Sequence, residues 1–359
     1  MYREVMFDIL PLSIIEFLEV IMNYSKIRFN QILIFLTFII LLIPASCNQT
    51  EKPLEFPFDH GPHYDVGTEW WYFTGEALTE EGRTLGFEFT IFKGRSRKKD
   101  GFGFLGHIAV SDPESSKHYY TEKALPILSD IEEGMADIRL EGFTYIFSQS
   151  DGIILKAEGE EVALDLSLTP AMDVLPHGED GIIVMGDGLN SYYYSFTNLL
   201  TVGNITIKGT EYTVSSGRTW MDHQWGNFTF FGMFWDWFSL RLENGGAIML
   251  FQFRDIFDNK VRTNWTYRLA DGSVLYGLDS SVRATRTYLD EQSKSTYPID
   301  WTIRIDAIDA EFHVEPLFDA QSLDNRMTPD YWEGLCLAEG TVGGEYLSGS
   351  AYVELTGYN

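Results

Sequence analysis

Apolar and polar side chains alternate along most of the chain after Thr68. The alternation is clearest in residues 87–92, which read FEFTIF, and in residues 162–168, which read VALDLSL. A period of two residues is typical of a strand with one buried face. The pattern therefore predicts a series of short strands.

Turn signals separate these predicted strands at short intervals, as at Asp151-Gly152. No long segment has a convincing helical period, and residues 121–137 and 321–331 are expected to be short helices or irregular loops. Many short strands joined by hairpins indicate a sandwich or barrels. The predicted fold class is therefore all-β and antiparallel.

Two aromatic clusters divide the chain into similar halves. Residues 70–73 read WWYF, and residues 235–238, about 165 positions later, read WDWF. Each cluster opens a series of alternating residues. We expect two barrel-like domains, over residues 54–228 and 229–359. One continuous sandwich with coincidental aromatic clusters is the alternative.

The N-terminal region has the pattern of an export signal. Residues 31–43 form an apolar run of the length found in signal peptides, and small residues then lead to Cys47. This resembles a bacterial lipoprotein processing site, so residues 1–47 are predicted to be a signal and Cys47 a lipidated N-terminus in the bacterial cell envelope. A plain secretory signal or an uncleaved anchor is the alternative. Acidic residues precede Met22 and basic ones follow it, which favours translation from Met22.

Composition narrows the range of partners. The 53 acidic residues outnumber the 26 basic ones, giving a formal net charge of -27. This excess argues against binding to nucleic acid or to anionic membrane surfaces. Only Cys47 and Cys336 are present, so neither a disulfide framework nor a thiolate zinc site can be built.

Three segments concentrate residue types that could carry chemistry, namely residues 59–71, 106–107 and 220–226. They hold four of the seven histidines. Such residues in an apolar barrel could form a pocket that binds a hydrophobic ligand and acts on it. Most of these residues could equally well have a structural role, in forming a turn, in packing the core or in a buried hydrogen-bonded pair. Glu69 either faces solvent or is a buried carboxyl that needs a partner such as a histidine.

Several familiar kinds of site are not indicated. His60 and His63 lack the HExxH spacing with which a helix presents two imidazoles, so no metal site is predicted. No Gly-x-Ser-x-Gly elbow or Walker loop occurs. Gly101, Gly103 and Gly106 match a dinucleotide-binding pattern, but a strand-like segment follows them, and we expect a glycine-rich hairpin. No cofactor is expected.

Six motifs resemble those of the AttH/CrtC family. They are DHGPH at 59–63, TEWWY at 68–72, GHIA at 106–109, WMDHQWG at 220–226, WDWF at 235–238 and YVELTGY at 352–358. This family includes carotenoid 1,2-hydratases, kievitone-hydratase-like proteins, lipocalin-like pericyclases and secreted proteins described as hydrolases. The resemblance implies two lipocalin-like antiparallel β-barrel domains packed together, with a pocket in or between them for hydrophobic polyenes or polyketides.

The resemblance also implies a reaction. In the hydratases a carboxylic acid protonates a carbon–carbon double bond and water captures the cation, which aromatic faces stabilise. His223 matches the hydratase-like segment, whereas Gln252 stands where the hydratases carry an acid. The expected catalytic residues are His223 with Asp222, Glu69 or Asp236. The side chains expected to bind substrate are His63, Trp70, Trp71, His107, Trp225, Trp235, Trp237 and Gln252.

Three functions remain open from the sequence. The first is a cofactor-independent hydratase, isomerase or cyclase acting on an apolar unsaturated substrate. The second is a lipocalin-like carrier that binds a hydrophobic ligand without chemistry. The third is a secreted hydrolase, although no nucleophile with a base beside it can be named. The expected partners are a hydrophobic small molecule and, through the lipid anchor, a membrane.

Overall fold

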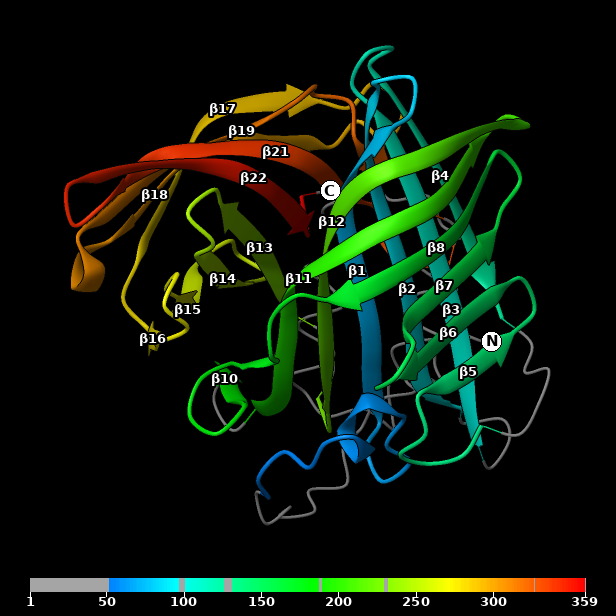
Figure 1. The fold of residues 1–359 in the computed structure, drawn as a ribbon. Coiled ribbons are helices and arrows are strands. Elements are labelled where there is room, and N and C mark those ends of the chain that lie inside the picture. The colour runs from blue at the N-terminus through cyan, green and yellow to red at the C-terminus, as the bar shows by residue number, and fades with distance from the viewer. Residues whose placement is uncertain are drawn as a thin grey trace, which may run out of the picture. The chain divides into compact units, whose positions relative to one another are not determined.

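The computed structural model describes residues 52–96, 101–125, 131–186, 189–228, 232–325 and 327–358. The predicted signal, including Cys47, lies outside these residues. Within them, no helix has the length and apolar character needed to cross a membrane. Apart from two short 3₁₀ helices, η1 (Phe58–His60) and η2 (Asp306–Ile308), the regular structure described is entirely strand, which confirms the all-β fold class (Figure 1).

The first antiparallel sheet has the strand order β4-β3-β2-β1-β12-β11-β8-β7-β6-β5, and β9 and β10 both pair with β11. Its strands are β1 (Thr68–Thr79), β2 (Thr84–Ser96), β3 (Gly101–Asp112), β4 (Lys117–Ala124), β5 (Asp137–Leu140), β6 (Phe143–Ser148), β7 (Gly152–Glu158), β8 (Val162–Pro170), β9 (Leu175–Pro176), β10 (Ile182–Gly186), β11 (Leu189–Ile207) and β12 (Thr210–Gly226).

The second antiparallel sheet has the order β16-β15-β14-β13-β22-β21-β19-β18-β17, and β20 pairs with β21. Its strands are β13 (Met233–Leu242), β14 (Ala247–Asp255), β15 (Lys260–Arg268), β16 (Val274–Gly277), β17 (Ser281–Leu289), β18 (Thr296–Ile305), β19 (Ala310–Pro316), β20 (Ser322–Leu323), β21 (Tyr331–Val342) and β22 (Glu345–Thr356).

The two sheets repeat one connectivity. In each sheet the opening strand lies between the second strand and the last one, so β1 lies between β2 and β12, and β13 lies between β14 and β22. The aromatic clusters WWYF and WDWF stand in these two opening strands. The chain passes from the first sheet to the second between Gly226 and Met233. This arrangement agrees with the lipocalin-like two-domain fold.

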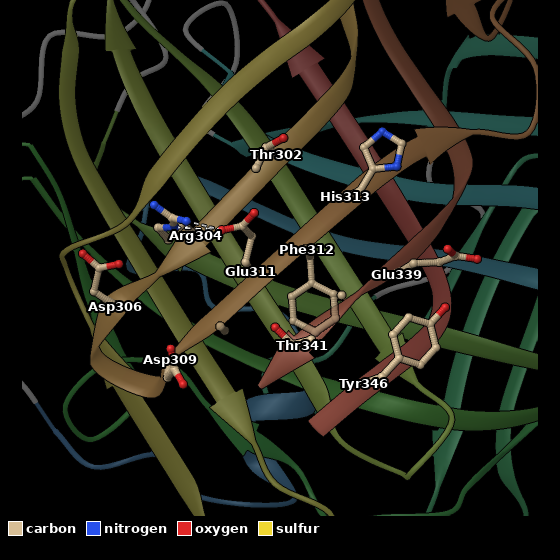
Figure 2. A pocket seen from close by; sticks show the side chains of 12 residues that line it. Thr302, Arg304, Asp306, Asp309, Glu311, Phe312, His313, Glu339, Thr341 and Tyr346 are labelled. Carbon is tan, nitrogen blue, oxygen red and sulfur yellow. Dashed lines mark hydrogen bonds and ion pairs between the residues drawn. The ribbon is translucent and has the colours of Figure 1, made fainter. Parts of the chain in front are cut away.

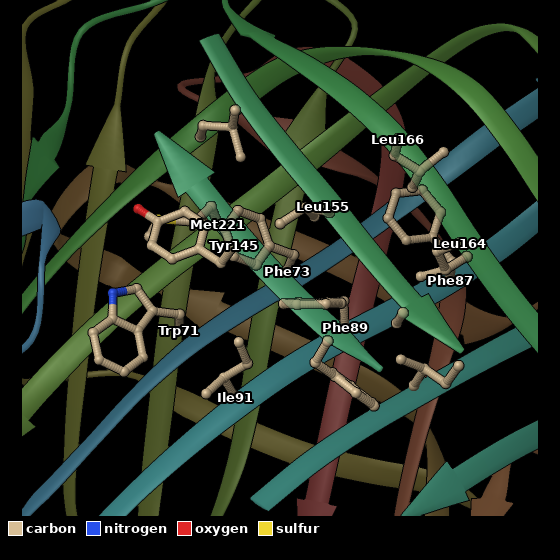
Figure 3. Close-up of a cluster of buried hydrophobic side chains, with 14 of the residues drawn as sticks. Trp71, Phe73, Phe87, Phe89, Ile91, Tyr145, Leu155, Leu164, Leu166 and Met221 are labelled. Atoms are coloured by element: carbon tan, nitrogen blue, oxygen red, sulfur yellow. The ribbon is translucent and has the colours of Figure 1, made fainter. Parts of the chain in front are cut away.

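Alternation sorts the side chains of β1 and β12 onto two faces. Trp71, Phe73 and Met221 enter the core enclosed by the first sheet, where they pack with Phe89 and Tyr145 (Figure 3). Burying each such side chain contributes roughly 1.5–3 kcal/mol. The opposite face packs on the second sheet, and we call this contact the inter-sheet layer. Its apolar members include Trp70, Tyr72 and Trp220 from the first sheet and Trp237, Leu335 and Tyr352 from the second.

The segments expected to be short helices or irregular loops contain no α-helix among their described residues. In residues 121–137, β4 ends at Ala124 and β5 begins at Asp137, while residues 126–130 lie outside the described part. The glycine-rich hairpin is formed by β2 and β3. Gly106 is required there, because a Cβ atom would come within 2.7 Å of the Leu125 and Phe143 side chains.

Candidate functional site

A cluster of charged side chains lies inside the first sheet, and we call it the inner polar cluster. It consists of Asp59, His63, Glu69, Lys93 and His223, all buried. Asp59 belongs to η1, His63 follows it, and the other three come from β1, β2 and β12. Strand pairing brings them together, because Glu69 lies opposite Lys93 on β2 and opposite Trp225 on β12, two positions from His223 and therefore on the same face.

Glu69 is the centre of the inner polar cluster. Its Oε1 atom lies 2.7 Å from His63 Nδ1 and 2.9 Å from His223 Nε2. Its Oε2 atom accepts hydrogen bonds from Lys93 Nζ at 2.7 Å and from the His63 backbone N–H at 3.0 Å. His63 Nε2 lies 3.0 Å from Asp59 Oδ1. Both carboxylate oxygens of Glu69 therefore have two close partners each.

These contacts decide the charge of each group. Burial alone would lower the pKa of His63, but its bonds to Asp59 and Glu69 raise that pKa to about 9. Burial would raise the pKa of Glu69, but His223, His63 and Lys93 hold it far below its usual range. Burial lowers the pKa of His223. The cluster thus holds ionised groups in an apolar core and is stabilised by their mutual pairing.

Two indole rings enclose the imidazoles. Trp225 stacks on His63 with 4.2 Å between ring centroids, and Trp71 stacks on His223 at 4.7 Å. Glu69 and His223 have no exposed side-chain surface. The inner polar cluster is therefore closed off from solvent except at Asp59 and His63.

Three carboxyl groups meet in the inter-sheet layer, and we call them the inter-sheet acids. Glu333 on β21 lies directly opposite Glu354 on β22, and Glu88 on β2 faces them from the first sheet. The Tyr72 hydroxyl donates to Glu333 Oε1 at 2.5 Å, and the Thr90 hydroxyl donates to Glu88 Oε1. Within the described residues, the second oxygens of Glu88 and Glu333 are buried without a hydrogen-bond partner.

Burial keeps these acids neutral. It is the main cause that raises the pKa of Glu354 to about 8, and burial with the charges of Glu88 and Glu354 raises that of Glu333 further. Carboxylates directly opposite on adjacent strands also repel each other. In the part of the chain that the structure describes, no lysine or arginine forms an ion pair with any of the three. At neutral pH they are therefore carboxylic acids that can donate a proton.

Glu354 is the member of this group that solvent reaches. It is half-buried, whereas Glu88 and Glu333 are fully buried. Trp235, also half-buried, is its hydrogen-bond partner. The Tyr352 hydroxyl, on the same face of β22, is buried and has no partner among the described residues. An acid at the edge of an aromatic layer is suited to donate a proton to an apolar molecule.

The residues predicted from the sequence separate into three places. Asp222 and His223 are adjacent in β12 and therefore point to opposite faces, so the predicted catalytic set does not converge on one point. The inner face of the first sheet holds His63, Glu69, Trp71, His223 and Trp225. The inter-sheet layer holds Trp70, His107, Asp222, Trp235 and Trp237. The interior of the second sheet holds Asp236 and Gln252.

Both carboxylate oxygens of Asp222 accept hydrogen bonds. It accepts hydrogen bonds from the Tyr193 hydroxyl at 2.6 Å, from Trp220 Nε1 at 2.5 Å and from the Ser195 hydroxyl. His177 Nε2 lies 2.6 Å from the same serine oxygen. The order is carboxylate, serine, histidine, whereas a serine nucleophile needs the histidine in the middle. This group gives no support to a hydrolase.

Asp236 forms an ion pair inside the second sheet. It accepts hydrogen bonds from Arg254 Nη2 at 3.0 Å, Gln252 Nε2 at 2.9 Å and the Tyr358 hydroxyl at 2.8 Å. Gln252, Arg254 and Tyr358 line a cavity of about 330 Å³. Because arginine does not give up its proton, Arg254 can orient a ligand but cannot serve as a proton donor to it.

A second opening lies on the outer surface of the second sheet. This groove of about 670 Å³ is lined by β18, β19, β21 and β22, with Arg304 paired to Glu311 across it (Figure 2). Asp306, Asp309 and Glu339 make the rest of its lining acidic. Such a surface does not suit an apolar substrate.

The sequence did not single out the inter-sheet acids. Glu88 is a polar position of the alternating run 87–92, and Glu354 stands in the YVELTGY motif at 352–358. Alternation marks such positions as facing away from the strand's own core and so suggests solvent. Only the packing of one sheet on the other places them in a buried layer.

Comparison with known proteins identifies the family. The family model described as AttH-like matches residues 48–358. The chain belongs to the AttH-like family. An AttH-like protein from Nitrosomonas europaea shares 32% sequence identity with this family member, with a TM-score of 0.79 over 89% of this chain and 100% of the other.

Two more distant structures share the fold of this AttH-like chain. Kievitone hydratase from Nectria haematococca is 16% identical, with a TM-score of 0.71 over 88% of this chain and 98% of the other. CghA, in complex with Sch210972, is 14% identical, with a TM-score of 0.57 over 88% and 95%. No functionally curated protein matches the sequence.

Proposed function

We propose that the protein is an enzyme of the hydratase or lyase type, which acts on an apolar unsaturated substrate of isoprenoid or polyketide-like character at the inter-sheet acids. One observation carries the proposal. Glu354 is a neutral carboxyl, half-buried beside Trp235, whose ionisation is disfavoured by burial and by the charge of Asp222, and Glu333 lies directly opposite it. A proton donor of this kind is what addition to a carbon–carbon double bond requires.

The reaction would proceed in two steps. Glu354 donates its proton to one carbon of the double bond and becomes a carboxylate, and the other carbon becomes cationic. Water then bonds to the cationic carbon and returns a proton to Glu354. The indole of Trp235 offers a π face to the cation. Positioned acid–base catalysis of this kind contributes typically about 10²–10⁴-fold to a rate.

The fold supports the same proposal. Kievitone hydratase and CghA share the two-sheet architecture, and this architecture creates the inter-sheet layer in which Glu354 lies. Membership of the AttH-like family is compatible with hydratase or lyase chemistry.

A carrier without catalysis is the second candidate. The observation that favours it is the set of buried polar atoms left without partners, including Glu333 Oε2 and the Tyr352 hydroxyl. Such donors could hold an oxygen-bearing hydrophobic ligand without reacting with it. A carrier would bind ligand and leave it unchanged.

We further propose that the protein is exported and lipid-anchored at Cys47. The support is the apolar run at 31–43 followed by small residues and a cysteine. An anchor would hold the domains beside a membrane, in which hydrophobic substrates collect. Metabolic labelling with a fatty acid should modify the protein, and Cys47→Ala should abolish the label.

Isotope incorporation tests the catalytic proposal. The purified protein is incubated with apolar polyenes and enones in water enriched in heavy oxygen, and the products are analysed by mass spectrometry. We expect labelled alcohol from the native protein and from the control Glu345→Gln, an exposed position on the same strand. Glu354→Gln should lower its formation by about 10²-fold or more. Equal formation by Glu354→Gln would refute the role of this acid.

A further inference from the structure

Three groups of the inner polar cluster point to one place. His63 Nδ1, Glu69 Oε1 and His223 Nε2 lie within 4.8 Å of one another, and all three residues are buried. They come from the segment before β1, from β1 and from β12, so no local sequence motif connects them. Two imidazoles and a carboxylate are a ligand set used by zinc and by other divalent transition metals.

The outer nitrogens of both imidazoles are held by Asp59. His223 Nδ1 lies 3.0 Å from the Asp59 backbone oxygen, and His63 Nε2 lies 3.0 Å from the Asp59 carboxylate. These oxygens can only accept, so each hydrogen bond places a proton on the outer nitrogen. Glu69 Oε1 also only accepts, so in the metal-free protein an imidazole can donate to it through its inward nitrogen, and that nitrogen presents a lone pair toward Glu69 once the proton is released.

The inward face therefore brings three potential metal-binding atoms together. His63 Nδ1 and His223 Nε2 lie 2.7 and 2.9 Å from the same oxygen, Glu69 Oε1. A divalent ion would replace the protons that lie between these atoms in the metal-free protein, because metal ligands bind in their deprotonated form. Glu69 Oε2 is fixed separately by Lys93 and the His63 backbone N–H. Each of the three groups thus has the kind of outer hydrogen bond that orients metal ligands.

Charge also favours a cation. Asp59 and Glu69 contribute two negative charges and Lys93 one positive charge, so once His63 has released its extra proton the cluster has a net charge of about -1 in a buried setting. The Lys93 ammonium weakens cation binding but contacts only Glu69 Oε2 of the carboxylate and leaves Oε1 available.

We propose that His63 Nδ1, Glu69 Oε1 and His223 Nε2 bind a divalent transition-metal ion of the zinc class. Three protein ligands leave one position open for water. The ion would fasten the N-terminal segment carrying Asp59 and His63 to β1 and β12. This site lies on the face of those strands opposite the inter-sheet acids and does not depend on the function proposed for them.

Zinc binding to the full chain tests the proposal. The protein is stripped with a chelator, dialysed against Zn²⁺ and analysed for metal, and Co²⁺ substitution gives a visible spectrum. We expect about one zinc per chain, and a loss of affinity of at least about 10-fold in His223→Gln and in Asp59→Asn. His313→Gln is the matched control, because His313 with Asp300 and Glu315 forms an exposed group that could also attract metal.

Each outcome either supports or overturns the proposed metal site. Zinc retained by His223→Gln, or lost in His313→Gln, would place the ion elsewhere and overturn the proposal. If His223→Gln does not fold, the Co²⁺ spectrum of the native protein decides, and a spectrum equal to that of aqueous Co²⁺ overturns the proposal. Glu354→Gln should bind zinc normally, so failure of the metal site and failure of the proposed function are distinguishable.

Discussion

The two faces of the first sheet are lined by polar clusters of opposite character, the inner polar cluster on one face and the inter-sheet acids on the other. On the inner face, Glu69 is ionised, and both its oxygens have close partners among Lys93, His63 and His223. On the outer face, the inter-sheet acids are neutral, and some of their oxygens have no partner among the described residues. Strand β2 contributes to both clusters, with Lys93 on its inner face and Glu88 on its outer face. A carboxylate with partners on both oxygens stabilises the fold, whereas a neutral carboxylic acid with an unpaired oxygen is suited to proton transfer.

The second sheet contains an ion pair that can be compared with the inner polar cluster. Asp236 occupies the opening strand β13 much as Glu69 occupies β1, and Arg254 on the next strand pairs with it as Lys93 pairs with Glu69. Each sheet therefore holds a buried carboxylate paired with a basic side chain of the next strand. Among the described residues, the pair in the first sheet also contacts two histidines, His63 and His223, which can take up and release protons.

Removing the central carboxylate should have the largest effect on stability. Glu69→Ala would leave Lys93 as a buried charge without its ion-pair partner, and His63 with Asp59 alone. We expect the free energy of unfolding to fall by about 3–5 kcal/mol. Denaturant unfolding monitored by tryptophan fluorescence measures it, with the exposed Glu80→Ala as control. A loss equal to that of the control would show that the cluster does not stabilise the fold.

Alkaline pH should weaken the protein through the inter-sheet acids. The pKa of Glu354 rises from 4.5 to about 8 in the folded protein, so its contribution to stability is fully present below about pH 4.5 and is lost as the pH rises through about 8. Turnover should decline over the upper part of this range, because the donor loses its proton. Unfolding curves across pH should show a shallower decline in Glu354→Gln. An unchanged slope would contradict the raised pKa.

A smaller effect is expected where one neutral hydrogen bond is lost. Tyr72→Phe removes the donor to Glu333 and keeps the aromatic packing against Trp237. The free energy of unfolding should fall by about 1–3 kcal/mol, since the buried Glu333 Oε1 then loses the hydrogen bond from Tyr72. Thermal unfolding checks this value. A stabilised variant would indicate that the hydroxyl is not bonded to Glu333.

The smallest effect should come from Ser195→Ala. The Ser195 hydroxyl donates to Asp222, which keeps its bonds from Tyr193 and Trp220. We expect a loss of about 1 kcal/mol and unchanged turnover. A collapse of turnover with intact folding would reinstate a nucleophilic serine.

Much of the fold was predictable because it depends on local patterns. Alternation in segments such as 87–92 gave the strands, and the WWYF and WDWF clusters marked the opening strand of each half. The inner polar cluster was partly predictable, since one of the two alternatives for Glu69 was a buried carboxyl that needs a partner such as a histidine. The inter-sheet acids were not, because the position of Glu354 against Glu333 and Glu88 depends on strand pairing and on packing between sheets.

The protonation state of Glu354 tests the central claim most directly. Infrared spectroscopy of the native protein at neutral pH detects the carbonyl stretch of a neutral carboxylic acid, separately from carboxylate bands. We expect such a band in the native protein, and we expect Glu354→Gln to reduce it while the exposed control Glu345→Gln leaves it unchanged. A native spectrum without neutral carboxyl bands, or one that Glu354→Gln does not alter, would contradict the account.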